Sequence, residues 1–200
     1  MDALEAIGTR RSLRQLDARP VPDEIIARLL ELACLAPAPH HTKPWRYVVI
    51  GPDRRDDLAT RMGEAWRRDL ESDGHPPALI EKLLRKSRRQ ITGAPALILG
   101  CLTHEGLRDW PDDRRARNEF AMAQQSIGAG MQNIMLGAHA LGLASYWISA
   151  PLFAPEAVRD ALDLPAEYIA QAFVVVGYPA PGIEPKPRAT PDLSKLITRR

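Results

Sequence analysis

The chain has 200 residues, of which 45% are hydrophobic and 26% are charged, and its formal net charge is +2. This composition excludes an intrinsically disordered chain, and the small net charge argues against a dedicated nucleic-acid-binding protein. The length predicts one domain over residues 1–200, with enough chain to bury a sizeable core.

Only two cysteines are present, Cys34 and Cys101, and they have no CxxC spacing. The sequence therefore indicates neither a zinc site nor a disulfide framework, and we expect both thiols to be small buried side chains. Asp2 and Glu5 interrupt the N-terminal residues, and no apolar run approaches the ~18 residues of a membrane span. We expect a cytoplasmic protein with no metal, no membrane and no nucleic-acid partner.

The hydrophobic pattern predicts alternating helices and strands, with no internal repeat and no linker. In the first half, helices are expected over 2–7, 22–33, 53–70 and 78–91, and strands over 46–50 and 96–102. In the second half, helices are expected over 115–141 and 155–162, and strands over 146–148 and 170–177. A polar loop over 107–113 carries Trp110, and the proline-rich tail from Tyr178 is expected to be extended. The result is a mixture of helices with about four strands.

The helix expected over 115–141 is unusually long, and its apolar residues cover more than one narrow stripe. A helix that is apolar most of the way round is buried centrally or at a subunit interface, so we expect a homodimer. Gly128, Ala129 and Gly130 lie inside this helical pattern rather than between a strand and a helix. Close helix packing therefore explains them better than a phosphate-binding loop does.

A basic cluster stands near the N-terminus, where Arg10, Arg11, Ser12, Leu13 and Arg14 follow one another. Guanidinium groups pair well with phosphate oxygens, and a serine hydroxyl adds a hydrogen bond. Taken alone, such a run is more often a solvated basic turn. Its functional interpretation depends on a second motif further along the chain.

That second motif is a proline-rich loop that leads into the strand at 46–50. Pro37, Pro39 and Pro44 restrict its backbone, so its amides and side chains can meet a rigid ring at little cost in ordering. The adjacent His40 and His41 are awkward as metal ligands and have no third ligand beside them, so we expect them to hydrogen-bond a ligand. Together, the two motifs predict a phosphorylated cofactor with a flat ring system.

Two further cations, Lys186 and Arg188, alternate along the tail and can face one side of an extended chain. Solubilising charge explains them as well. No Ser-His-Asp order or spaced pair of acids stands out in the sequence. If the protein is an enzyme, we expect a cofactor rather than a side chain to supply the chemistry.

Four segments resemble the FMN-dependent nitroreductase family, in the order in which that family carries them. RRSLR resembles its N-terminal phosphate-binding motif, and APAPHHTKPWRYVV resembles its PSxxNxQPW loop, with His41 and Lys43 in place of the usual Asn and Gln. GLASYWISAP resembles the segment whose backbone faces the flavin N5. VVVGYPAP, followed by Lys186 and Arg188, resembles its closing strand and second phosphate clamp.

The resemblance implies an α+β sandwich, with a mixed, mainly antiparallel sheet flanked by helices. It also implies an intertwined homodimer that holds FMN at two interface sites, with the tail over 178–200 closing each site. The residues assigned to the cofactor are Arg10, Arg11, Ser12, Leu13, Arg14, Pro37, Ala38, Pro39, His41, Lys43, Arg89, Ile148, Ser149, Ala150, Lys186 and Arg188.

Within that set, the Arg10–Arg14 cluster and the two tail cations would hold the phosphate and ribityl chain, and residues 37–43 would line the flavin. Backbone amides near Ser149 and Ala150 would hydrogen-bond N5 and O4. Lys43 or Arg89 would place a cation at the pyrimidine edge. His40 and Trp110 are assigned to the substrate side, and no side chain is assigned as catalytic.

The loop sequence and FAPEAVRDALDLPAE further along look most like one subgroup, the C-terminal reductase domain of the γ-glutamyl ligase that builds the deazaflavin coenzyme. The resemblance then implies an FMN-dependent oxidoreductase that takes a hydride from NAD(P)H and reduces a dehydro precursor of that coenzyme.

Several alternatives stay open at this point. A generic NAD(P)H-dependent nitro or quinone reductase comes second, and an enzyme that dismantles flavin itself, as the family's benzimidazole-forming branch does, comes third. A non-catalytic flavin or deazaflavin binding protein, or a structural dimer without a ligand, would carry the same basic motifs.

Overall fold

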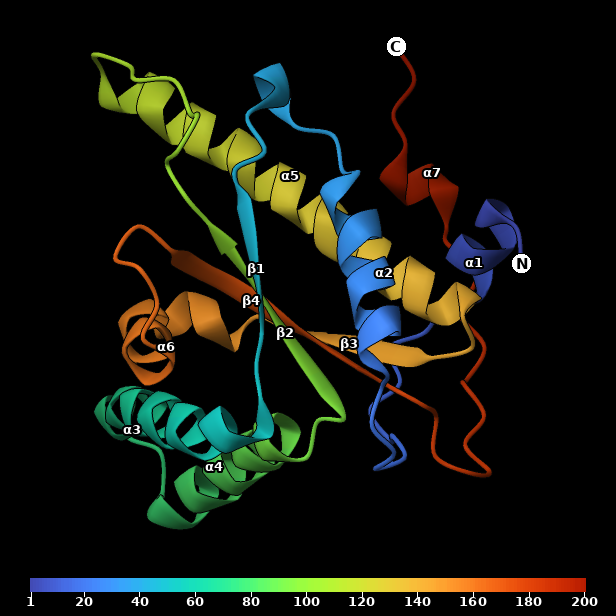
Figure 1. Ribbon diagram of the computed structural model, residues 1–200, viewed down its shortest axis with the longest axis vertical. Helices are drawn as coiled ribbons and strands as arrows, with labels where there is room; N and C mark the ends of the chain where they lie inside the picture. The colour runs from blue at the N-terminus through green and yellow to red at the C-terminus, as the bar shows by residue number, and fades with distance from the viewer.

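The computed structural model describes residues 1–200 and places a four-stranded sheet between two layers of helices (Figure 1). The strands are β1 (Trp45–Val49), β2 (Ala96–Leu102), β3 (Ala144–Ile148) and β4 (Ile169–Gly177). Their order is β1-β2-β4-β3, and every neighbouring pair is antiparallel. One isolated parallel bridge joins Ser12 to Ser145. The expected α+β sandwich is confirmed.

Seven α-helices and three short 3₁₀ turns complete the chain. The helices are α1 (Ala3–Thr9), α2 (Asp23–Cys34), α3 (Arg55–Ser72), α4 (Pro77–Thr92), α5 (Asp113–Ala140), α6 (Pro155–Leu162) and α7 (Leu193–Leu196). The 3₁₀ turns are Pro39–His41, Pro52–Arg54 and Ala150–Phe153. None of the helices combines the length and the apolarity that crossing a membrane requires.

The two layers exist because side chains of the central strands alternate between the faces of the sheet. Ile98 of β2 and Val174 of β4 belong to the core under α2 and α5. Their neighbours Leu99 and Phe173 belong to the core under α3, α4 and α6. Because both faces are buried, β2 and β4 are continuous apolar runs, which is why the sequence predicts them so clearly.

Every expected helix and strand is present, and their ends lie within two residues of the predicted ones. The first helix continues past Gly8 to Thr9, and the tail is not wholly extended, because Asp192 caps the short helix α7 by accepting from the Ser194 amide across 3.2 Å. In Figure 1 the tail passes beside α1 before it reaches the C-terminus.

The prediction that both cysteines are buried is confirmed for Cys101 and wrong for Cys34. Cys101 is buried in β2, and burial raises the pKa of its thiol to about 12. Cys34 is exposed at the end of α2. The neighbouring Ala33 takes the fully buried position, and the next helical residue points about 100° further round the helix axis.

Glycines allow α5 to approach its neighbours closely. A Cβ on Gly137 would lie 2.6 Å from Cδ1 of Leu32, and a Cβ on Gly130 would lie 2.1 Å from the Tyr47 hydroxyl oxygen. Gly128, in contrast, has no atom within 4 Å of the place its Cβ would take. Close packing within one chain therefore explains Gly130 and leaves Gly128 on an open face.

We expect Gly130→Ala to lower the free energy of unfolding by about 1–3 kcal/mol, because the added methyl group overlaps the Tyr47 hydroxyl. Gly63→Ala on α3, where nothing lies within 4 Å, is the matched control and should gain up to about 1 kcal/mol. Adding Tyr47→Phe to Gly130→Ala should recover part of the loss. Denaturant unfolding measures all three, and a Gly130→Ala protein as stable as the wild type would contradict the close approach.

Candidate functional site

The C-terminal tail returns to the N-terminal segment and pairs with it. The Asp17 amide donates to the Tyr178 carbonyl across 2.9 Å, and the Ala180 amide donates to the Gln15 carbonyl across 3.1 Å. The Arg19 guanidinium also lies 3.5 Å from the centre of the Tyr178 ring. Two segments more than 160 residues apart in sequence are thereby held side by side.

This pairing gathers four cations. The side chain of Arg11 donates to the Lys186 carbonyl across 3.2 Å, and Arg188 donates to the Arg10 carbonyl across 3.3 Å. None of the four forms an ion pair with a carboxylate, although nine ion pairs occur elsewhere in the chain. The structure therefore brings the Arg10 cluster and the tail cations together, as the family resemblance implies.

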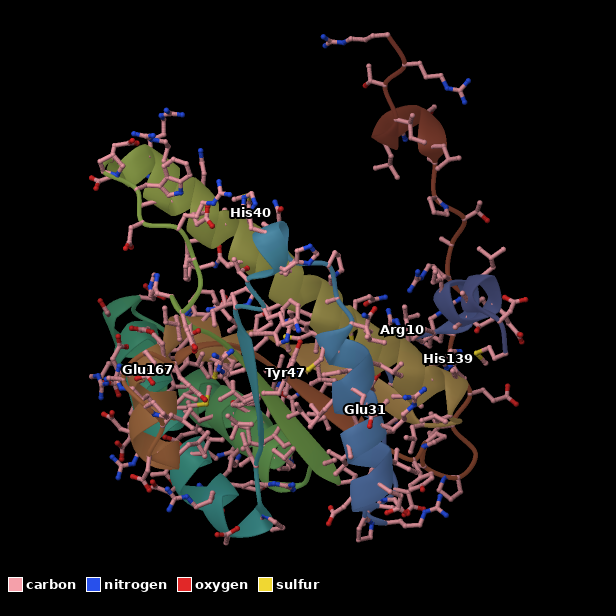
Figure 2. All side chains as sticks on the ribbon, turned by 45° about the horizontal axis from the view of Figure 1, so that its top comes forward. Arg10, Glu31, His40, Tyr47, His139 and Glu167 are labelled. Atoms are coloured by element: carbon pink, nitrogen blue, oxygen red, sulfur yellow. The ribbon has the colours of Figure 1, made fainter.

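The charges in this cluster repel one another. Burial, and then the positive charges of Arg188 and Arg11, lower the pKa of the Arg10 guanidinium. One of its nitrogens, Nη1, is buried without a hydrogen-bond partner. Burial, then Arg10 and Arg11, likewise lower the pKa of His139, which lies beside Arg10 at the end of α5 (Figure 2). Unpaired like charges with a free buried donor are suited to an anion, which would offset their repulsion.

Strand β3 leads from this cluster into the molecule. Ser12 bridges to Ser145, and the Leu13 amide donates to the Ser145 carbonyl across 3.2 Å. The Ser145 hydroxyl is buried and has no hydrogen-bond partner. Arg14 lies 5.6 Å from the centre of the Tyr146 ring. All five residues of the basic cluster are therefore placed at the start of β3 or next to the tail.

A cavity of about 500 Å³ adjoins the other end of β3. Ile148, three residues from Ser145 and therefore roughly 10 Å along the strand, lines it together with Ala150. Ser149 lies between them and accepts from the indole nitrogen of Trp147 across 2.8 Å. The remaining lining residues come from α3, α4 and the segment after β3: Met62, Trp66, Asp69, Asp73, Leu83, Lys86, Ser87, Gln90, Phe153 and Ala154.

The helix α4 contributes to this cavity with residues other than the predicted one. Lys86, Ser87 and Gln90 line it, whereas Arg89 is exposed on α4 and is not part of the lining. Lys86 belongs to the same run of basic residues in the sequence. Lys86 is not assigned to a site from the sequence, because the rotation of a helix about its own axis is set by packing, which the sequence does not reveal.

The proline-rich loop has a strained backbone. His40, His41 and Lys43 have φ angles of 54°, 57° and 50°, which place three non-glycine residues in the left-handed region. Each such residue costs of order 1 kcal/mol or more, and such strain is concentrated at functional sites. The Thr42 hydroxyl holds the loop by donating to the Pro39 carbonyl across 3.0 Å. Trp45, which follows, is a buried core residue, as expected.

Within one chain, this loop and the cation cluster do not meet. His40 is hydrogen-bonded to Arg108, whose amide contacts Glu119 on the N-terminal part of α5, whereas Arg10 lies beside His139 at the helix's other end (Figure 2). Twenty residues of helix separate Glu119 from His139, a distance of roughly 30 Å. Pro37, Ala38, His41 and Lys43 therefore lie far from the cations with which they were grouped. No group of three His, Cys, Asp or Glu side chains is arranged as metal ligands would be.

The fold and the cation cluster thus define an α+β protein in which unpaired cations are joined by β3 to a cavity of about 500 Å³. The chain belongs to the Nitroreductase family, whose model matches residues 7–178.

The chain aligns with most of the length of the proteins to which it is similar. It is 29% identical over 182 residues to a protein of Methanothermobacter thermautotrophicus assigned as an NADH dehydrogenase/NAD(P)H nitroreductase, covering 90% of this chain and 78% of that protein. It is 30% identical over 191 residues to the 5,6-dimethylbenzimidazole synthase of Rhodospirillum rubrum, covering 89% and 82%. The crystal structure of a Desulfovibrio desulfuricans protein assigned as a nitroreductase, in complex with FMN, superposes with a TM-score of 0.73 at 26% identity, covering 100% and 98%.

Proposed function

We propose that this protein is a homodimeric oxidoreductase that transfers a hydride from NAD(P)H, through bound FMN, to an electron-poor acceptor. The observation that carries the proposal is the cluster of unpaired cations joined by β3 to the 500 Å³ cavity. Membership of the Nitroreductase family and the FMN complex of a 26% identical relative support FMN as the cofactor. The name of the M. thermautotrophicus relative supports NAD(P)H as the hydride donor.

The residues present fit FMN. The free Nη1 of Arg10 and the cations of Arg11, Lys186 and Arg188 would hold the phosphate, and Ser12 with the unpartnered Ser145 hydroxyl would meet the ribityl chain. The ring system would enter the cavity beside Ile148, Ser149 and Ala150. Lys86, rather than Arg89, would supply the cation of that cavity. A volume of about 500 Å³ is ordinary for a cofactor site.

A second copy of the chain would supply the residues 37–43, because one copy holds them away from its own cations. The outer face of α5 suits such a dimer. Ala121, Gln125 and Gly128 follow one another at helical spacing on that face, the first two are exposed, and Gly128 has open space around it. At Ala121 and Gly128 the side chain is a methyl group or absent, so a second helix could approach closely at these two positions. The exposed Cys34 and the use of NAD(P)H fit the predicted cytoplasmic location.

Removing the phosphate site should affect FMN and spare riboflavin. We expect Arg10→Ala combined with Arg188→Ala to weaken FMN binding about 100-fold, since two charge-assisted contacts to the phosphate are lost. Riboflavin, which lacks the phosphate, should bind the double variant about as well as it binds the wild type. Arg68→Ala on α3, an exposed arginine without an ion pair, is the control. Fluorescence titration measures both affinities. If FMN and riboflavin lose affinity equally, the phosphate does not bind at these two arginines.

The dimer can be tested by mixing two defective chains. Arg10→Ala/Arg188→Ala damages the cation half of the site, and His41→Ala/Lys43→Ala damages the loop half. Each homodimer should retain little FMN. After unfolding and refolding together at equal amounts, about a quarter of all sites should combine two intact halves and bind FMN. Recovery no better than the average of the two homodimers would mean that each chain builds its own site.

We propose a dehydro precursor of the deazaflavin coenzyme as the acceptor. The support is the resemblance of the loop over 36–46 and of residues 153–167 to the reductase domain of the γ-glutamyl ligase. The hydride and a proton from solvent would add across one carbon–carbon double bond. The 30% identical relative favours a second candidate, formation of 5,6-dimethylbenzimidazole from the flavin.

Competing acceptors distinguish these functions. With NAD(P)H and the FMN-loaded dimer, we expect kcat/KM for the dehydro precursor to exceed that for menadione or nitrobenzene by about tenfold or more, because a shaped pocket favours its own substrate. Mass spectrometry should show a gain of two hydrogens in the product. Similar kcat/KM values for all three acceptors would support a generic nitro or quinone reductase. Dimethylbenzimidazole formed from FMN under oxygen would support the second candidate.

A further inference from the structure

The segment over 103–112, between β2 and α5, packs against the strained loop. The Thr103 amide donates to the Pro44 carbonyl across 2.9 Å. Gly106 has a φ of 77°, and a Cβ there would lie 3.2 Å from the Thr42 carbonyl oxygen. The segment and the loop therefore form one unit, and whatever ligand the loop contacts also comes near this segment.

A buried carboxylate holds the segment in place. Glu119 on α5 is only 3% exposed, and its two oxygens accept from the Arg108 amide across 3.3 Å and from the Trp110 indole nitrogen across 3.1 Å. The Arg115 guanidinium lies 4.8 Å from the centre of the Trp110 ring and covers it. Both oxygens of the carboxylate are thus engaged by an amide and an indole, and neither pairs with the guanidinium of Arg108.

The side chain of Arg108 makes an unusual contact. It donates to Nδ1 of His40 across 3.2 Å, although it is exposed and forms no ion pair with Asp109 or Glu105. An imidazole that accepts at Nδ1 is neutral and carries its proton on Nε2. The pair therefore offers the remaining guanidinium N–H groups and the Nε2–H group, and it offers no acceptor.

A small cavity adjoins Arg108. It has a volume of about 160 Å³, and its lining includes two carboxylates beside the guanidinium. The lining residues are His104, Leu107, Arg108, Asp109, Trp110, Ala116, Glu119 and Phe120. A cavity of ~150 Å³ holds one benzene ring. His104 and Phe120 are stacked with ring centres 5.5 Å apart, so one wall is aromatic. A ring-bearing molecule would find this flat wall beside the guanidinium of Arg108, whereas the oxygens of Glu119 are already engaged by an amide and an indole.

We propose that Arg108 and His40 bind an anionic group, a carboxylate or a phosphate, of the reactant that approaches the proposed flavin site. The proposal rests on the proposed function, because the loop that carries His40 is the loop assigned to the flavin. Arg108 is the principal donor, and His40 orients it and adds a second N–H group. Glu119 is a positioning residue that fixes the backbone of Arg108. The anionic group belongs either to the acceptor or to the 2′-phosphate of NADPH.

A matched pair of nitroaromatics tests the charge directly. With the FMN-loaded wild type, 4-nitrobenzoate should be reduced with a higher kcat/KM than 4-nitrobenzamide. In Arg108→Gln this preference should fall about tenfold, through KM rather than kcat, because one charge-assisted contact is lost. Arg108→Lys should keep part of the preference, since it keeps the charge without the planar fork. Arg117→Gln, an exposed arginine on α5 without an ion pair, is the control.

Binding gives a readout that does not depend on turnover. Benzoate should change the visible spectrum of the bound flavin at a lower concentration than benzamide does, and Arg108→Gln should remove that difference. If the ratio of kcat/KM for NADPH over NADH falls instead, the anionic group is the phosphate of the donor. If neither ratio changes while FMN content stays normal, the anion site is refuted. A wild type that binds no FMN would refute the proposed function instead.

Discussion

The need to bury both faces of β2 and β4 governs the rest of the architecture. A strand that is apolar on both sides requires a helical layer above and below, and the chain supplies α2 and α5 on one side and α3, α4 and α6 on the other. The anion site and the ring-sized cavity then lie near opposite ends of β3, the edge strand that pairs with β4. The sheet therefore sets the distance between the two parts of the proposed cofactor site.

Stability is given up at the places where a ligand is proposed. Arg10 is partly buried among like charges, with one nitrogen unpartnered, and residues 40, 41 and 43 hold left-handed backbone conformations. Each feature raises the free energy of the folded chain. A bound anion would offset the repulsion among the cations, and a rigid ring could bind the loop without ordering it first. Local rules are usually broken in this way at functional sites.

Much of the fold could be predicted from the sequence because its signals are local. Residues 96–102 form an apolar run that begins after Pro95, and Pro155 stands at the first position of α6, so both elements were predicted to the residue. The side of a helix on which a residue lies was harder to predict. Cys34 was placed on the wrong side of its helix, because a rotation of about 100° separates adjacent helical residues. The meeting of Arg188 with Arg10 depends on pairing between distant segments, and only the family resemblance pointed to it.

The division of the motifs between the two ends of α5 explains why this chain needs so long a helix. A single chain that placed loop and cations together would require only a short connection between them. Here 28 residues of α5 hold them apart, and the same helix presents an uncovered face that carries Ala121 and Gly128. In a two-fold dimer built on that face, the separation becomes an advantage, since each end of one helix is brought beside the opposite end of the other. Arg108 and the strained loop would then approach the partner's cations. Each cofactor site would be formed across the dimer interface, with the loop of one chain and the cations of the other, and the reactant would bind there too.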